Sequence, residues 1–300
     1  MTRQQTLTPA PGLVRDWAAL GAVLVTVVAW SSAFVAIRWV GETYDPGPLS
    51  LGRLLVGSAV LGLMVRARRG WIRPTRREWG LLLLCGIAWF AVYNVALNAA
   101  EQRIDAGTTA MLVNVGPILI AVLAGCLLGE GFPPWLMVGA AVALGGALLI
   151  GIATRTAGGA DVLGALLALV AATTYAVGVV AQKPVVRRLP ALQVTWLACT
   201  IGAVACLPFA PGLVTNLAEA PAGATVGVVY LGVVPTAVAF STWAFALARM
   251  DAGRLGVTTY LVPPLTIALA WVLLGEIPPP LAIAGGLVSL VGVGLSRRRG

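Results

Sequence analysis

Residues 105–134 read DAGTTAMLVNVGPILIAVLAGCLLGEGFPP, and residues 251–280 read DAGRLGVTTYLVPPLTIALAWVLLGEIPPP. Both stretches begin with Asp-Ala-Gly, carry a proline near the middle and end in Leu-Gly-Glu followed by Pro-Pro, all at one offset of 146 positions. Identities of this kind at a single offset indicate a duplicated half. Each copy is therefore expected to supply half of any site that the protein has.

Composition places the chain in a membrane. Of the 300 residues, 59% are hydrophobic and 10% charged, with a mean hydropathy of +0.93, whereas soluble domains are about a quarter charged. The chain has no histidine, and its four cysteines (Cys85, Cys126, Cys199 and Cys206) lie in apolar runs without metal-ligand spacing. We interpret them as small buried hydrophobic residues and expect no metal and no cofactor.

A bilayer-crossing helix needs about 20 mostly apolar residues. Cutting the chain at its charges predicts ten such helices: Trp17–Ile37, Gly47–Val65, Trp79–Ala100, Ala106–Gly129, Pro133–Ala153, Val162–Gln182, Pro190–Ala210, Ala224–Ala248, Leu255–Gly275 and Pro279–Ser296. The predicted fold class is therefore an all-α polytopic membrane protein, built from two five-helix repeats over residues 17–153 and 162–296.

The basic residues predict the orientation of these helices. With the N-terminus in the cytoplasm, the inner segments hold 16 of the 20 lysine and arginine residues. This bias predicts that both termini are cytoplasmic, in the inner or plasma membrane, and makes the net charge of +9 a matter of topology rather than of nucleic-acid binding. Because five is odd, the second repeat starts from the opposite side, so the two repeats are expected to be inverted.

Pro117 and Pro263 fall in the middle of equivalent predicted helices. Each proline should kink its helix and free a carbonyl, on Val113 and Thr259, that needs a partner within the membrane. Asn114 and Tyr260 stand three residues before the prolines at equivalent positions. The pattern favours a central cavity at the two kinks, and the alternative is that the prolines only shape packing.

Other polar and aromatic residues point to the same interior. Tyr93, Asn94 and Asn98 lie on one predicted helix, where the amides need partners in the bundle or water in a cavity. Trp30 and Tyr175 are equivalent at an offset of 145, and Trp243 lies on the eighth predicted helix. These aromatic residues suit a pocket for an organic solute, with interfacial anchoring or plain packing as the alternative.

Arg53 is the one ionisable residue well inside a predicted helix, and it has two interpretations. It binds a carboxylate, or it snorkels to the head groups. The Gly-Glu corners at Glu130 and Glu276 predict tight hairpins, with gating as the alternative. The small-residue runs Gly139–Gly146 and Gly285–Gly294 predict close helix packing within one chain, with a homodimer as the alternative.

The chain resembles the drug/metabolite transporter superfamily, of the ten-helix type with two EamA domains. The resemblance rests on Trp30 to Arg38, on Arg53, and on the paired patterns that run from Ala106-Gly through Pro117 to Glu130 and from Asp251-Ala-Gly through Pro263 to Glu276. It implies an inner-membrane carrier, often an exporter of amino acids, other metabolites or toxic organic molecules. Small relatives couple transport to protons through a glutamate in their first helix, which has no acid here, so such coupling is disfavoured. Asp16, Glu101 and Asp161, near helix ends, remain candidates.

The residues therefore predict a carrier that moves a small organic solute by rocking of inverted halves, with membrane lipids as partners through the arginine-rich loop Val65–Glu78. An enzyme is not expected, because paired aspartates, Ser/His pairs and HExxH are missing from the helices, so no catalytic residue is assigned. The remaining alternative is a non-transporting membrane sensor or assembly partner.

Overall fold

The computed structural model describes residues 17–68, 70–129, 161–250 and 252–296, together with short pieces between residues 134 and 152. The elements of the first part are α1 (Trp17–Val40), α2 (Pro46–Ala67), α3 (Arg76–Cys85), η1 (Gly86–Val92), α4 (Tyr93–Glu101), α5 (Ala106–Val113) and α6 (Gly116–Leu128). Those of the second part are α8 (Val162–Val186), α9 (Ala191–Ala205), η2 (Leu207–Phe209), α10 (Ala210–Glu219), α11 (Ala222–Leu231), η3 (Gly232–Val238), α12 (Ala239–Leu247), α13 (Ala252–Thr258), η4 (Thr259–Leu261), α14 (Val262–Leu274) and α15 (Pro280–Ser296). Of the predicted helix Pro133–Ala153, the structure describes only these short pieces.

Six helical segments in these ranges are long and apolar enough to cross a bilayer. They are Trp17–Val40, Pro46–Ala67, Arg76–Glu101, Ala106–Leu128, Val162–Val186 and Ala222–Leu247. A seventh consists of Ala191–Ala205 and Leu207–Glu219 if this pair, bent by 51°, is one span, and Thr259–Leu274 and Pro280–Gly292 are shorter apolar helices. The prediction of an all-helical, multi-pass membrane protein is confirmed.

The internal repeat of the sequence returns in the secondary structure. The segments η1 and η3 are both seven-residue π-helices, and their first residues, Gly86 and Gly232, are 146 positions apart. Gly129 and Gly275, at the same offset, end α6 and α14 in the left-handed conformation, with φ of 72° and 70°. This confirms the predicted glycine ends of both helices. Glu130 and the rest of the first corner lie outside the described residues.

A short interruption of the regular α-helix precedes each of Pro117 and Pro263, and Ala106–Leu128 is still one span. The helix α5 stops at Val113, and α6 starts at Gly116 with Pro117 in its first turn. Likewise α13 gives way to the 3-10 turn η4, and α14 starts at Val262 with Pro263 in its first turn. The physical reason is that the missing N–H of proline needs no acceptor in a first turn, so a new helix begins there.

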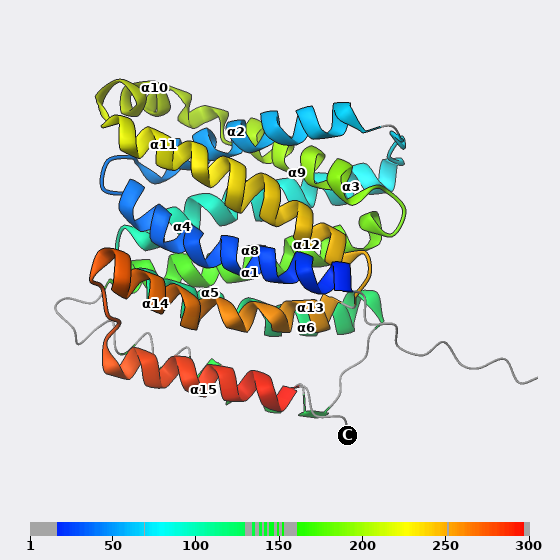
Figure 1. The fold of residues 1–300 in the computed structure, drawn as a ribbon. Helices are drawn as coiled ribbons and strands as arrows, with labels where there is room; N and C mark the ends of the chain where they lie inside the picture. The colour runs from blue at the N-terminus through cyan, green and yellow to red at the C-terminus, as the bar shows by residue number, and fades with distance from the viewer. Residues whose placement is uncertain are drawn as a thin grey trace, which may run out of the picture.

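The first helix of each half packs on the third and fourth helices of the other half. Helix α1 contacts α12 and α14, and α8 contacts α4 and α6. Figure 1 shows α1 crossing the middle of the bundle, with α15 along its edge. Close approaches seat these helices: a Cβ on Gly178 of α8 would lie 2.3 Å from the Cβ of Trp89, so only glycine fits.

Three further details bear on the predictions. A Cβ on Gly146 would lie 2.4 Å from the carbonyl oxygen of Gly285, so the two small-residue runs meet within one chain. Cys126 is exposed, whereas the other three cysteines are buried as expected. The prediction ended a helix at Ala210 and missed α10, although Pro211 stands in its first turn, where proline favours helix.

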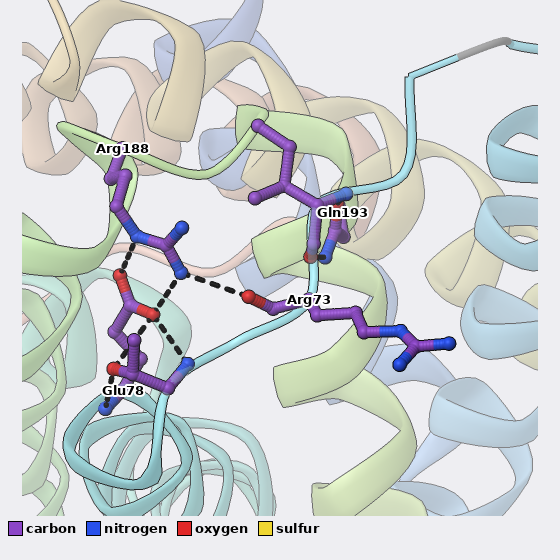
Figure 2. Close-up of polar contacts among 6 residues, drawn as sticks. Arg73, Glu78, Arg188 and Gln193 are labelled. Atoms are coloured by element: carbon purple, nitrogen blue, oxygen red, sulfur yellow. Dashed lines mark hydrogen bonds and ion pairs between the residues drawn. The ribbon is translucent and has the colours of Figure 1, made fainter.

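The loop between α2 and α3 is tied to the second half (Figure 2). Glu78 completes a capping box with Thr75 at the start of α3 and accepts hydrogen bonds from the guanidinium of Arg188. Arg188 also donates to the carbonyl of Arg73 at 3.0 Å, and the amide of Gln193 binds both main-chain groups of Ile72. These bonds fix one end of the bundle, which is called the loop end below.

Candidate functional site

Five aromatic side chains from both halves surround the centre of the bundle. Trp30 of α1 has its ring centroid 6.1 Å from that of Trp89, 6.3 Å from Tyr175, 5.4 Å from Phe240 and 5.1 Å from Trp243. Edge-to-face and tilted contacts of this kind are favourable between aromatic rings. We call these five residues the aromatic cluster. It brings together three of the predicted site residues, Trp30, Tyr175 and Trp243.

A cavity of about 30 Å³ lies beside the aromatic cluster, where the two broken helices meet. Its lining residues are Trp30, Phe34, Trp89, Tyr93, Ala110, Val113, Asn114, Tyr175, Thr259 and Val262. A water needs about 10–15 Å³ of such space, so this volume holds about two waters and no organic solute. In this conformation the site is therefore too small for an organic solute.

Four predicted residues line the cavity: Trp30, Tyr93, Asn114 and Tyr175. Asn114 ends α5, so the helix break presents it there. Tyr260 is not among the lining residues and packs against Ile118. Sequence reasoning missed Trp89 and Phe34, although each stands one helical turn from a predicted residue, Tyr93 and Trp30, and that spacing was an available signal.

The two asparagines of α4 make hydrogen bonds inside the bundle and do not line the cavity. The side-chain amide of Asn94 donates to the carbonyl of Phe90 at 2.7 Å, within its own helical run. The amide of Asn98 donates to the Ser50 hydroxyl at 2.8 Å and so joins α4 to α2. Of the two alternatives for these amides, a partner in the bundle or water in a cavity, Asn98 therefore follows the first.

Arg53 does not snorkel. Its side chain is 3% exposed, and its Nε and Nη2 both donate to the Thr236 hydroxyl at 3.2 Å. This burial contradicts the interpretation that the Arg53 guanidinium snorkels to the head groups.

Several buried donors around the site have no protein partner in the described part of the chain. They include the indole N–H groups of Trp30 and Trp243. A buried donor without a partner destabilises a protein, and water or a bound solute relieves that cost. The aromatic cluster can thus offer apolar surface together with hydrogen-bond donors.

At the end of the bundle opposite the loop end, charged residues of both halves meet. Arg38 Nε donates to Glu276 Oε1 at 2.7 Å, and Arg38 Nη1 donates to the main-chain oxygen of Glu101 at 2.6 Å. Glu276, at the predicted second corner, thus pairs with α1 of the other half. The carboxyl group of Glu101 is fully buried, and neither of its oxygens has a hydrogen-bond partner among the described residues.

A second cavity of about 830 Å³, which we call the vestibule, opens at the loop end. Its lining includes Ala18, Gly21 and Val25 of α1, Met64 and Val65 of α2, Arg68 and Trp71 of the loop, Gln193 of α9 and Ser241, Thr242, Phe245 and Arg249 of α12 and its end. Its volume lies in the range of drug-sized pockets, about 300–1,000 Å³.

Two contacts separate the vestibule from the small cavity. Thr26 and Thr242 share a hydrogen bond of 2.7 Å between their hydroxyls. One helical turn further along α1, Trp30 packs against Trp243.

Comparison with known proteins identifies the class of the molecule. The model of the EamA-like transporter family matches residues 17–152 and again residues 162–298. A probable terminal-alkyne amino-acid exporter of Streptantibioticus cattleyicolor is 38% identical over 94% of each chain. The uncharacterized transporter YdfC of Bacillus subtilis is 32% identical over 88% of this chain and 86% of its own. The uncharacterized inner membrane transporter YhbE of Escherichia coli K12 is 26% identical over 90% of each chain.

One solved crystal structure has the same fold, with a TM-score of 0.65 at 23% identity, over 94% of this chain and 97% of the other. The apolar helices and these relatives define a multi-pass membrane transporter and not an enzyme. The chain belongs to the EamA-like transporter family, and thereby to the drug/metabolite transporter superfamily that its sequence resembles.

Proposed function

We propose that this transporter exports an amino acid, or a closely related metabolite, with an apolar side chain. The observation that carries the proposal is the aromatic cluster, in which both halves place rings around one cavity beside unpartnered indole donors. Rings with a few polar groups suit an apolar solute that carries a polar end. The similarity to a probable amino-acid exporter supports this solute class.

The proposed architecture has ten helices in two inverted repeats, residues 17–153 and 162–296. The fixed offset of 146 in the π-helices and helix breaks supports the repeat. Reciprocal packing of α1 and α8 on the opposite halves supports an approximate two-fold relation between them. The excess of arginine at the loop end supports cytoplasmic termini and makes that end the inner one.

Alternating access follows from this arrangement. The small cavity has no room for a solute, Arg38 and Glu276 link the halves at the outer end, and the vestibule faces the cytoplasm. A solute enters the vestibule, the Thr26–Thr242 and Trp30–Trp243 contacts part, and the enlarged cavity receives it. Rocking of the halves then parts the outer contacts and releases the solute.

Exchange in proteoliposomes tests the proposal. Vesicles loaded with labelled L-leucine, L-phenylalanine or L-propargylglycine would be assayed for release that unlabelled external amino acid accelerates. We expect exchange by the wild type and a loss of about tenfold or more in Trp30→Ala and Trp243→Ala, while Trp271→Ala is unaffected because its ring is 61% exposed on the bundle surface. Absence of exchange by a folded wild type would contradict the proposal and favour a sensor or assembly role.

A further inference from the structure

The guanidinium of Arg53 lies in the interior, and no acidic side chain among the described residues pairs with it. It stands two turns inside α2, and its only hydrogen-bond acceptor in the described structure is the Thr236 hydroxyl. Its Nη1 is buried and makes no hydrogen bond to any described residue. A guanidinium has five N–H donors, and here only Nε and Nη2 donate, both to one hydroxyl. Most of the hydrogen-bonding capacity of this group is therefore unused.

In the described part of the chain, no negative charge lies beside Arg53 to neutralise it. The titratable groups that interact with it electrostatically are Tyr93 and Cys199, and neither side chain is ordinarily anionic at neutral pH. A buried cation is normally paired or hydrogen-bonded, and ionisable groups inside membranes mark binding sites and pathways. The arrangement therefore has room for an anion that the protein itself does not provide.

Two features connect this arginine to the solute cavity. Tyr93 belongs to both places, because it lines the cavity and interacts with Arg53. Thr236, which orients the guanidinium, lies in the π-helical segment η3, and π-helical turns occur frequently at functional sites. Arg53 and the aromatic cluster can thus serve the two ends of one molecule.

We propose that Arg53 binds the carboxylate of the transported solute while the aromatic cluster holds its apolar part. The inference rests on the proposed function and narrows it to solutes with a free carboxylate. A guanidinium pairs with a carboxylate through two parallel hydrogen bonds, a geometry that lysine cannot reproduce. The free Nη1 supplies one of these donors.

Matched pairs of ligands test this assignment in the purified full-length protein. L-leucine, L-phenylalanine and L-propargylglycine would each be compared with the corresponding carboxamide, which keeps the side chain and the amine but lacks the negative charge. Binding would be followed by quenching of tryptophan fluorescence from the aromatic cluster. The variants are Arg53→Met and Arg53→Lys, with Arg103→Met as a control because Arg103 lies in an ion pair at the surface, 42% exposed.

For the wild type and the control, we expect each acid to bind about ten- to hundredfold more tightly than its amide. In Arg53→Met the preference disappears because the acid weakens to the level of the amide. Arg53→Lys binds the acid more weakly than the wild type, since it keeps the charge without the planar fork. Arg53→Lys also provides the test if Arg53→Met does not fold.

Thermal unfolding separates binding from a structural role. If Arg53 serves the solute, removal of its unpaired charge leaves the ligand-free midpoint unchanged or raises it. A lower midpoint together with an intact preference for acids would assign Arg53 to structure and overturn the inference. Equal binding of acid and amide by the wild type would overturn the inference but leave the proposed function standing. Binding of neither member of any pair would overturn both.

Discussion

Lys183 and Arg38 make the same contact in the two halves of the chain. They are 145 positions apart, and each donates a hydrogen bond to a main-chain carbonyl at the end of the third helical run of its own half. The acceptors are Glu101 for Arg38 and Leu247 for Lys183, which are 146 positions apart. A cation at the end of the first helix, closing the last turn of the third, is therefore a repeated device of this fold.

Replacing Lys183, the single lysine of the chain, tests that device. Its ammonium donates to the carbonyls of both Leu247 and Met250, and its side chain is buried. In Lys183→Met these carbonyls lose their donor, so we expect the free energy of unfolding to fall by about 1–3 kcal/mol. Thermal unfolding in detergent measures this. Arg187→Met, in the same helix end but exposed, should change little, and an equal fall in both variants would contradict the assignment.

For Glu101 we expect the opposite result, that removal of the ionisable group does not lower stability. Its carboxyl oxygens are buried without hydrogen-bond donors in the described structure, and Arg38 serves the main-chain oxygen of this residue instead. Ionisation of such a group is costly, so the neutral amide of Glu101→Gln should leave the unfolding midpoint unchanged or raise it. A loss of about 3–5 kcal/mol would show instead that the native carboxylate is ionised and paired.

The contact between Gly178 and Trp89 predicts a coupled effect on stability and site. In Gly178→Ala the new methyl group collides with the tryptophan that lines the cavity, so we expect a loss of about 1–3 kcal/mol and weaker solute binding. Gly80→Ala is the matched control, because nothing lies within 4 Å of its added Cβ and Gly80 lines neither cavity. Thermal unfolding and fluorescence quenching measure the two effects. Equal behaviour of both variants would mean that Gly178 is not required for the packing.

Asp161, at the start of α8, gives a pH dependence. Its side chain accepts a hydrogen bond from the Gly164 N–H and pairs with Arg103, and these interactions lower the pKa of the carboxyl group. A lowered pKa adds stability above the ordinary value of about 3.9, and this stability is lost as the pH falls through the folded-state value. When the pH is lowered below about 4, the thermal unfolding midpoint of the wild type should therefore fall. The midpoint of Asp161→Asn should fall less. Parallel pH profiles would contradict the prediction.

The sequence predicted where helices end better than which of their faces point to the protein interior. Residues such as Asp105, Asp161 and Gly275 mark helix ends by local capping chemistry, and the structure places helix ends at all three. The burial of Arg53, the role of Trp89 and the bend after α9 depend on neighbouring helices. In a membrane protein both the lipid and the interior are apolar, so hydropathy does not distinguish the two faces of a helix.

The aromatic residues illustrate the same limit. The repeat offset paired Trp30 with Tyr175, and the structure places their rings 6.3 Å apart. No offset pointed to Trp89, because the equivalent position in the second half is Pro235. Some residues around the site, such as Trp89, thus have no aromatic counterpart in the other repeat. Only the packing of the helices shows that they belong to the site.

The unequal size of the two cavities has a consequence for pharmacology. In this conformation the inner cavity, at about 30 Å³, is too small for a drug-sized molecule, whereas the vestibule has a volume of about 830 Å³. A blocker designed against this state would act as a plug in the vestibule and stop the cycle without occupying the solute's place. Trp71 and Arg249 are among the side chains that such a blocker would contact.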